Sequence, residues 1–249
     1  MGASKTKKVG RLCRLGLALL LAAGLLLLHI FPRPAGVWPG VFRALSLSAA
    51  WEPDTPVFTF LDVGQGDSAL IRAGAWAVLI DSGTDGADLC RALRRQGVEK
   101  LHCLIATHPH ADHIGGMDMA AAAFDADTLL IADRPPAEES DRACYDRLLD
   151  AAEAEGMEVI HPADGYAFSV GDISLEIFSP LPDGDNENDR SLLVRAWAGG
   201  VTALVTGDAE ADAEAAVLRS GRDLSADILK VGLLPNLYFR FPVFFKDHH

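Results

Sequence analysis

Cysteines are few in this sequence, and their spacing excludes the metal sites that cysteine pairs build. Cys13, Cys90, Cys103 and Cys144 form no Cys-x-x-Cys pair, so they predict no zinc finger. Cys90 and Cys103 fall in an expected helix and an expected strand, where a free cysteine behaves as a small buried hydrophobic residue. We therefore assign the cysteines no function.

Acidic residues are absent before Trp51, although seven of the 22 basic residues lie there. From Trp51 onward the chain has 15 basic and 35 acidic residues, a formal charge of −20, against −13 for the whole chain. Such an acidic domain gains little from the counterion release that drives nonspecific binding to nucleic acid. A polyanionic substrate would therefore have to be held by local positive charge, above all by bound metal.

An apolar run at residues 15–31 follows a basic cluster within residues 1–14. Seventeen helical residues rise about 25 Å, near the lower limit for crossing a bilayer. The basic cluster predicts a cytoplasmic N-terminus, a single-pass anchor in the cell membrane and an external remainder. The alternative is a cleaved signal peptide. Residues 32–55 begin with Pro32 and Pro34 and are predicted to form a linker.

From residue 56 the chain alternates short apolar strands with amphipathic helices, a pattern that predicts an α/β layered domain over residues 56–232. We expect strands at residues 57–61, 69–72, 76–80, 101–107, 128–132, 158–161, 173–179, 191–197, 201–206 and 228–231. We expect helices at residues 87–96, 116–124, 141–155 and 211–220.

One motif carries most of the chemical information: Thr107-His108-Pro109-His110-Ala111-Asp112-His113, directly after an expected buried strand. Imidazole and carboxylate groups are ligands suited to zinc, manganese and iron. His108 and His110 lie two apart in an extended loop and can point the same way, while Asp112 and His113 turn toward a second point. One short loop can therefore serve two metals about 3.5–4 Å apart. A chance polar loop is the alternative, and the density of ligands argues against it.

His-x-His-x-Asp-His after a strand resembles the metallo-β-lactamase superfamily. Residues 60–68 (FLDVGQGDS) and 79–83 (LIDSG) are similar to the opening of the metallo-hydrolase domain of ComEC-type competence proteins. Residues 188–194 (NDRSLLV) and 204–210 (LVTGDAE) resemble later motifs of that subfamily. The resemblance implies an α/β fold, a metallo-β-lactamase-like αββα sandwich, which the N-terminal transmembrane helix would precede.

The resemblance also implies roles for particular residues. His108 and His110 would bind a first metal, Asp112 and His113 a second, and Asp208 would bridge both; Asp112 and Asp208 would also act in catalysis. Asp62, Gln65, Asp67 and Asp81 would orient these ligands through hydrogen bonds, although each could be a turn residue. Asn188 and Ser191 would face substrate or support the ligands, and a structural role in a loop stays open for both. The cofactors would be two divalent ions, zinc or manganese.

The resemblance breaks after Gly232. The subfamily would continue with a His-His-Gly-Ser segment that completes the second metal site, whereas this chain reads Leu233-Leu234-Pro235-Asn236. Four phenylalanines crowd into the remaining tail. We interpret residues 233–249 as an atypical tail, from a truncated or frameshifted reading frame, and expect the second metal site to be weakened.

The leading functional hypothesis is a metal-dependent hydrolase of phosphodiester bonds, a nuclease acting on extracellular DNA during uptake. One alternative is a hydrolase of another small ester or amide. The other is an inactive, membrane-tethered remnant. The sequence indicates the membrane as a partner and DNA as a candidate substrate, and it identifies no protein partner.

Overall fold

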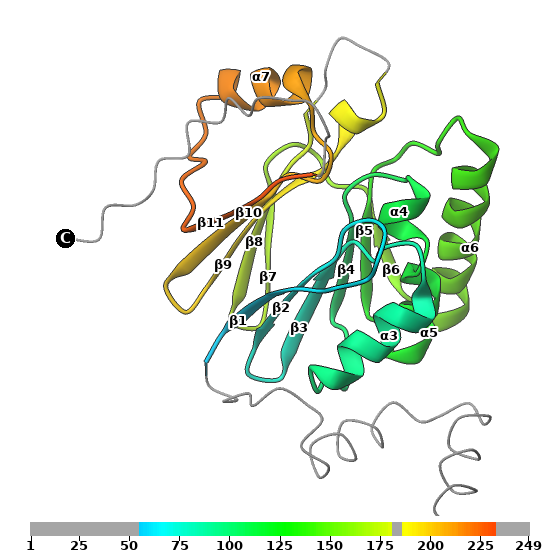
Figure 1. The fold of residues 1–249 in the computed structure, drawn as a ribbon. Helices are drawn as coiled ribbons and strands as arrows, with labels where there is room; N and C mark the ends of the chain where they lie inside the picture. Colours follow the sequence, from blue (N-terminus) through cyan, green and yellow to red (C-terminus); the bar gives the residue numbers. More distant parts are fainter. Residues whose placement is uncertain (1–54, 181–185, 233–249) are drawn as a thin grey trace, which may run out of the picture.

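The computed structural model describes residues 55–180 and 186–232. Within these residues two β-sheets face each other; several helices cover the outer face of the first sheet, and one helix lies across one end of the second (Figure 1). The expected anchor at 15–31, the tail at 233–249 and all but one residue of the linker lie outside this part of the chain. No helix in the described part is long and apolar enough to span a membrane.

The first sheet has the order β1-β2-β3-β4-β5-β6. Its strands are β1 (Val57–Phe60), β2 (Ala69–Ala73), β3 (Trp76–Ile80), β4 (Cys103–Ala106), β5 (Thr128–Ile131) and β6 (Glu158–Ile160). The first three strands pair antiparallel, and β3 to β6 pair parallel. The parallel half therefore brings the carboxyl ends of β4, β5 and β6 to one edge.

Four helices follow strands of this sheet: α3 (Gly86–Arg95), α4 (Ala111–Ile114), α5 (Met117–Ala123) and α6 (Glu139–Glu155). Helix α3 begins after Asp85, whose carboxylate accepts hydrogen bonds from the amides of Ala87 and Asp88, because the first amides of a helix lack internal partners. Helix α6 ends at Gly156, which adopts the left-handed conformation that glycine tolerates best.

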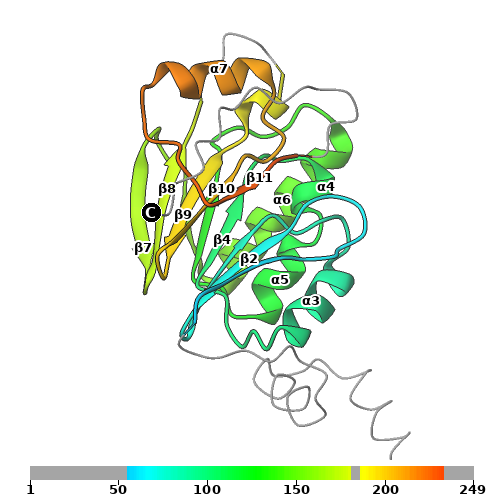
Figure 2. The same ribbon diagram turned by 60° about the vertical axis from the view of Figure 1, so that its left-hand side comes forward.

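The second sheet has the order β11-β10-β9-β8-β7. Its strands are β7 (Tyr166–Val170), β8 (Ile173–Phe178), β9 (Leu193–Ala198), β10 (Val201–Val205) and β11 (Ile228–Lys230). A 3-10 turn, η1 (Asn188–Arg190), precedes β9, and helix α7 (Ala211–Arg219) follows β10. Figure 2 shows α7 beside this sheet, on the side away from α3 and α5.

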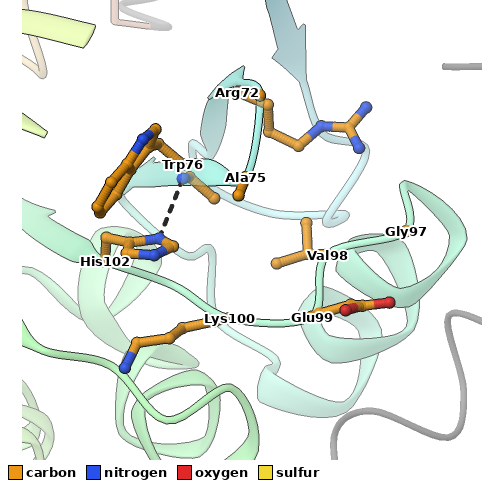
Figure 3. Close-up of a pocket in the computed structure, with 10 residues that line it drawn as sticks. Arg72, Ala75, Trp76, Gly97, Val98, Glu99, Lys100 and His102 are labelled. Atoms are coloured by element: carbon orange, nitrogen blue, oxygen red, sulfur yellow. Dashed lines mark hydrogen bonds between the residues drawn. The ribbon is translucent and has the colours of Figure 1, made fainter. Parts of the chain in front are cut away.

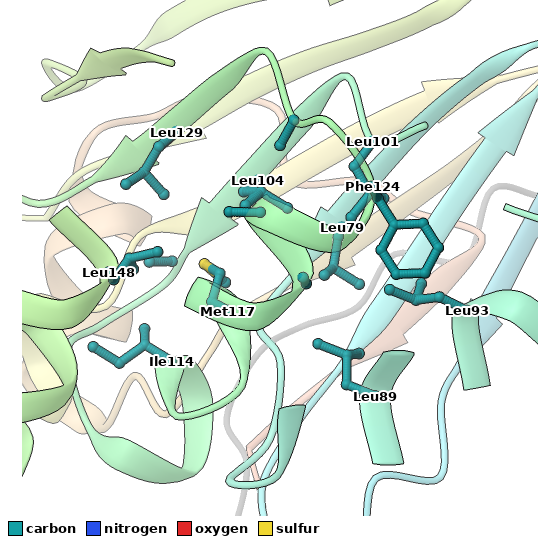
Figure 4. Close-up of a cluster of buried hydrophobic side chains, with 14 of the residues drawn as sticks. Leu79, Leu89, Leu93, Leu101, Leu104, Ile114, Met117, Phe124, Leu129 and Leu148 are labelled. Carbon is teal, nitrogen blue, oxygen red and sulfur yellow. The ribbon is translucent and has the colours of Figure 1, made fainter. Parts of the chain in front are cut away.

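Three apolar clusters hold these layers together. Side chains from both sheets, such as Ile105 and Val194, fill the space between them. The first sheet packs against α3, α5 and α6 through residues such as Leu104, Phe124 and Leu148, all fully buried (Figure 4). The second sheet packs against α7 through a smaller cluster that includes Val217. The expected αββα sandwich is therefore present.

The predicted strands and helices occur within two residues of their expected ends. The sequence interpretation missed three short elements: β7, α4 and η1. Helix α4 matters most, because it lies inside the histidine motif. Asp112 and His113, which we expected to turn toward a second metal, are therefore on a helical turn that the sequence interpretation did not predict.

Candidate metal centre

The histidine motif begins at the carboxyl end of β4, between the two sheets. Thr107 and His108 are completely buried there. The carbonyl oxygen of Thr107 accepts a hydrogen bond of 2.7 Å from the amide of Leu192, which precedes β9. This bond joins the end of β4 to the start of a strand of the second sheet, so the motif lies where both sheets meet.

His113 is held by a buried carboxylate. Its Nδ1 atom lies 2.8 Å from Oδ2 of Asp81, and its Nε2 atom faces Oδ1 of Asp208 at 3.4 Å. Burial opposes a charge on His113, but the carboxylates of Asp81 and Asp208 outweigh burial and raise the pKa of the ring to about 10. Asp81 thus fixes the orientation of the ring and leaves Nε2 directed toward Asp208.

Asp81 itself is fixed by several contacts in a strained backbone. It is 1% exposed and has a φ of 57°, a conformation that non-glycine residues rarely adopt. Its carboxylate accepts hydrogen bonds from the amide and the hydroxyl of Thr107, at 2.8 and 2.7 Å. Strain of this kind persists only where the surroundings determine the conformation, as happens at functional sites.

His108, His113 and Asp208 bring their ligand atoms within 4.8 Å of one another. Burial lowers the pKa of His108 well below its usual value, and the neighbouring rings of His113 and His110 lower it further. His108 is therefore neutral, the form that binds a metal. This group combines one residue from each expected metal site with the expected bridging aspartate.

His110 and Asp112 lie next to this group. Nδ1 of His110 is 3.0 Å from Nε2 of His108, so two ring nitrogens face each other. Nε2 of His110 lies 3.1 Å from Oε2 of Glu187, which the sequence did not single out. Asp112 is further from the group, with Oδ2 4.0 Å from Nε2 of His113.

Asp208 follows β10 and belongs to the second sheet. Its amide donates a 3.2 Å hydrogen bond to the buried hydroxyl of Ser191. Burial opposes ionisation of Asp208, but the hydrogen bond and the charge of His113 outweigh it and lower the pKa of the carboxyl. Gly232 passes so close to this carboxylate that a side chain there would overlap Asp208. Ser191 thus positions Asp208, a candidate ligand.

The loop after β1 carries three of the expected orienting residues. Asp62 and Gln65 are exposed in this loop and touch none of the grouped ligands directly. The amide of Asp67 donates to the carbonyl oxygen of Asp112 at 3.2 Å, and its carboxylate forms an ion pair with Lys230 of β11. Of the three, only Asp67 contacts the motif.

Asn188 and Asp189 form hydrogen bonds with residues at the start of α7. The amide nitrogen of Asn188 donates to Glu210 at 2.9 Å. Asp189, which the sequence did not single out, accepts from the amides of Glu210 and Ala213 at 3.0 Å each and so caps α7. The motif at 188–194 therefore holds the start of α7 in place beside Asp208.

Glu187 and Lys230, like Asp189, are residues near the site that the sequence interpretation missed. Glu187 stands in an acidic, asparagine-rich stretch without any local signal. Lys230 gave a weak signal, as a single charged residue within the apolar run Ile228-Leu229-Lys230-Val231. Within the described residues it is paired with Asp67.

The family model of the metallo-beta-lactamase superfamily matches residues 61–237, which is most of the chain. The chain belongs to the metallo-beta-lactamase superfamily. Among its curated relatives is ComE operon protein 3 of Bacillus subtilis, 29% identical over 69% of this chain and 24% of that protein. Competence protein ComA of Neisseria gonorrhoeae is 26% identical over 86% of this chain and 29% of its own length. The chain thus spans less than a third of either relative.

A solved structure confirms the superfamily fold. The Cronobacter sakazakii metallo-beta-lactamase with the HARLDQ motif covers 77% of this chain and 80% of its own, with a TM-score of 0.50 and 15% identity. A mutant of that enzyme covers 70% of this chain at the same TM-score. At 14–15% identity, the likeness to these structures shows a shared fold and no shared activity.

The superfamily implies a bound divalent metal, and the residues present fit one. Two imidazoles and a carboxylate converge from two sheets within 4.8 Å, a ligand set suited to zinc and related ions. The carboxylate of Asp81 behind His113 supplies the outer contact that metal-binding histidines usually have. His108, His113 and Asp208 are therefore the candidate ligands, with His110 and Asp112 beside them.

Proposed function

We propose that this domain is a metal-dependent hydrolase that cleaves phosphodiester bonds, with DNA outside the membrane as its substrate. The observation that carries the hydrolase proposal is the convergence of His108, His113 and Asp208 at the meeting edge of the two sheets. The similarity to a competence protein of Neisseria gonorrhoeae and to ComE operon protein 3 favours DNA among possible substrates.

Some residues of the site would bind the metal, and others orient the side chains that bind it. A divalent ion held there would act as a Lewis acid and lower the pKa of a water molecule to near neutrality. His108 supplies a neutral ring nitrogen, and Asp208 supplies negative charge. Asp81 keeps Nε2 of His113 directed into the site. Because these groups are fixed before substrate arrives, little reorganisation is needed during the reaction.

The sequence after Gly232 limits the activity that we expect from this chain. It lacks the His-His-Gly-Ser segment that the resemblance implies. We therefore propose two metal positions in the subfamily arrangement, with the second position weak in this chain. A weakly held second ion would leave the attacking hydroxide scarce at neutral pH, so the nuclease activity of this chain should be very low.

A replacement experiment tests this proposal. The full chain is compared with a variant in which His-His-Gly-Ser replaces Leu233-Leu234-Pro235-Asn236, using linear DNA with manganese or zinc. We expect metal-dependent cleavage only in the variant, and Asp208→Ala should abolish it there. If the unaltered chain cleaves DNA at ordinary rates, and His110→Ala leaves that rate unchanged, the proposed site is wrong.

The absence of the His-His-Gly-Ser segment also favours a second candidate, a membrane-tethered remnant without enzymatic activity. The same experiment separates the two. A replacement variant that binds metal but cleaves neither DNA nor a chromogenic phosphodiester would support the remnant. Hydrolysis of a simple ester without cleavage of phosphodiesters would instead indicate a different substrate class.

A further inference from the structure

Helix α4 carries Asp112 and His113, and it is too short to fix its own position. It has four residues, Ala111–Ile114, whereas an isolated helix shorter than about 12–15 residues is only marginally stable in water. The positions of the Asp112 and His113 side chains therefore depend on contacts that other parts of the domain make with this turn.

Ser82, which comes after β3, holds the carboxyl end of α4. The carbonyl oxygen of His113 accepts hydrogen bonds from the amide of Ser82 at 2.7 Å and from its hydroxyl at 2.8 Å. Ile114 is buried in the apolar cluster between the first sheet and its helices. The last residues of the turn are therefore attached to the first sheet.

The amino end of α4 is capped by a residue from another helix. The N-cap position is occupied by His110, whose side chain makes no capping hydrogen bond. The amide of Ala111 donates instead to Oδ1 of Asp141, at 2.9 Å. The first amides of a helix have no acceptor within the helix. Asp141 therefore supplies from a distant part of the chain the acceptor that a capping side chain usually supplies locally.

Asp141 belongs to a helix that is packed firmly on the first sheet. It is the third residue of α6, and α6 lies beside α4 (Figure 1). Leu148 and Ala152, further along α6, are completely buried in the cluster that joins this helix to the sheet. Movement of Asp141 away from Ala111 would therefore require movement of the start of a well-packed helix.

A second contact joins the same two segments of the chain. Oε1 of Glu187 accepts a hydrogen bond of 2.8 Å from the amide of Ala137, and Oε2 of Glu187 lies 3.1 Å from Nε2 of His110. Ala137 precedes Asp141 by four residues, and His110 directly precedes Ala111. The start of α6 is thus joined to the histidine motif at two points, through a side chain at His110 and through the backbone at Ala111.

We propose that Asp141 is a positioning residue of the metal centre, acting through the amide of Ala111. Their hydrogen bond fixes the turn from which Asp112 and His113 face the site. The proposal rests on the proposed function only in treating this site as a metal centre. Contacts of this kind matter because metal affinity depends on groups that hold the ligands in place.

Zinc affinity of the full chain, measured by competition with a chromogenic chelator, tests this role without any substrate. We expect Asp141→Ala to weaken zinc binding about tenfold, the size of effect usual for contacts behind a metal ligand. Asp141→Asn keeps an oxygen that can accept the hydrogen bond from Ala111, so its zinc affinity should stay within about twofold of the unaltered chain.

A second substitution shows whether Asp141 acts through this one amide. Proline has no N–H group and is favoured at the first position of a helix, and the φ of −76° and ψ of 148° at His110 suit a residue before proline. The double variant Asp141→Ala/Ala111→Pro therefore has no amide left without an acceptor. It should recover most of the zinc affinity that Asp141→Ala loses, whereas a role of Asp141 confined to the stability of α6 would give no recovery.

Two exposed glutamates provide matched controls. Glu139→Ala removes a carboxylate from the same first turn of α6, and so tests whether charge at the start of that helix is enough to explain the effect. Glu99→Ala removes a carboxylate from the wall of a cavity of about 460 Å³, before β4 and at the opposite end of that strand from the histidine motif (Figure 3). Both variants should bind zinc as the unaltered chain does.

The proposal is overturned if Asp141→Ala binds zinc as tightly as Glu139→Ala does. It is also overturned if Asp141→Asn loses as much affinity as Asp141→Ala, or if Ala111→Pro gives no recovery. Circular dichroism in EDTA shows whether each variant is folded. If Asp141→Ala alone does not fold, the double variant decides: unaltered zinc affinity supports the role, and weaker binding or failure to fold overturns it. Because no substrate is present, failure of this role and failure of the nuclease proposal are distinguishable.

Discussion

Glu187 holds the outer nitrogen of His110, with 3.1 Å between Oε2 and Nε2, while Nδ1 of the same ring faces Nε2 of His108 at 3.0 Å. A carboxylate accepts hydrogen bonds, so this contact places the ring proton on Nε2. The unprotonated Nδ1 is then the atom available to a metal. Glu187 is thus a positioning residue for His110.

Removing Glu187 should weaken metal binding. We expect Glu187→Ala to lower zinc affinity about tenfold, the size of effect usual for contacts behind a metal ligand. Glu187→Gln keeps an oxygen acceptor and should recover much of the affinity. Competition with a chromogenic chelator measures both, with Glu155→Ala at the exposed end of α6 as the control. Unchanged affinity in Glu187→Ala would contradict the positioning role.

Asp81 should stabilise the metal-free protein as well as the site. Asparagine at this position keeps only one of the two acceptor oxygens of Asp81. Its NH2 group would face donors on Thr107 or His113, so at least one buried donor would lose its acceptor. We expect Asp81→Asn to reduce the free energy of unfolding by about 3 kcal/mol. Urea denaturation in EDTA measures the loss. Asp62→Asn, in the exposed loop after β1, should change stability little, and an equal loss in both variants would count against this account.

Metal binding should raise the midpoint of thermal unfolding, and this increase should depend on Asp208 as a ligand. An ion that binds only the folded protein stabilises it by about 2.7 kcal/mol at a concentration a hundredfold above its Kd. We expect zinc to raise the midpoint of the unaltered chain relative to EDTA, and Asp208→Asn to lose most of this increase. Differential scanning fluorimetry with and without zinc makes the comparison. A full zinc effect in Asp208→Asn would show that the ion binds elsewhere.

The number of tightly held metals should be about one, because the second position lacks its expected histidine. Elemental analysis after extensive dialysis of the purified chain gives this number directly. The replacement variant with His-His-Gly-Ser should retain about two. Two equivalents in the unaltered chain would mean that an unrecognised ligand completes the second position.

Gly66 should be less tolerant of a side chain than Gly64. Both glycines have positive φ angles, +91° and +78°, but only at Gly66 would a Cβ overlap the carbonyl group of Asp112. We expect Gly64→Ala to cost about 1 kcal/mol from backbone strain, and Gly66→Ala roughly 3 kcal/mol because the clash adds to it. Urea denaturation compares the pair. Equal losses would indicate that the loop moves away from α4.

Most of the fold was predictable because its strands and helices carry their own patterns. Cys103 to Ala106 is a continuous apolar run, as is typical of a strand buried on both faces. Strand β7 was missed although Gly165 and Gly171 bound it and its residues alternate between partly buried and exposed, with Tyr166, Phe168 and Val170 on the partly buried face. Helix α4 spans four residues, too few for a helical period to appear.

The sequence predicted which candidate ligands would lie close together better than it predicted the contacts around them. His108, His113 and Asp208 were identified from the sequence, and the three meet in the structure. Glu187 and Lys230 escaped notice because their partners lie 77 and 163 residues away in the chain. Such contacts depend on how the two sheets are brought together, and no local pattern encodes that.

The hydrogen bond between Leu192 and Thr107 lies where the two sheets meet. His108 and His113 follow β4 of the first sheet, and Asp208 follows β10 of the second. An ion bound by all three would cross-link the two sheets. Sliding of one sheet against the other would then require the ion to leave, and loosening of the apolar layer between the sheets would weaken the ion's hold. Metal binding should therefore strengthen the packing of the two sheets, and loss of that packing should release the metal.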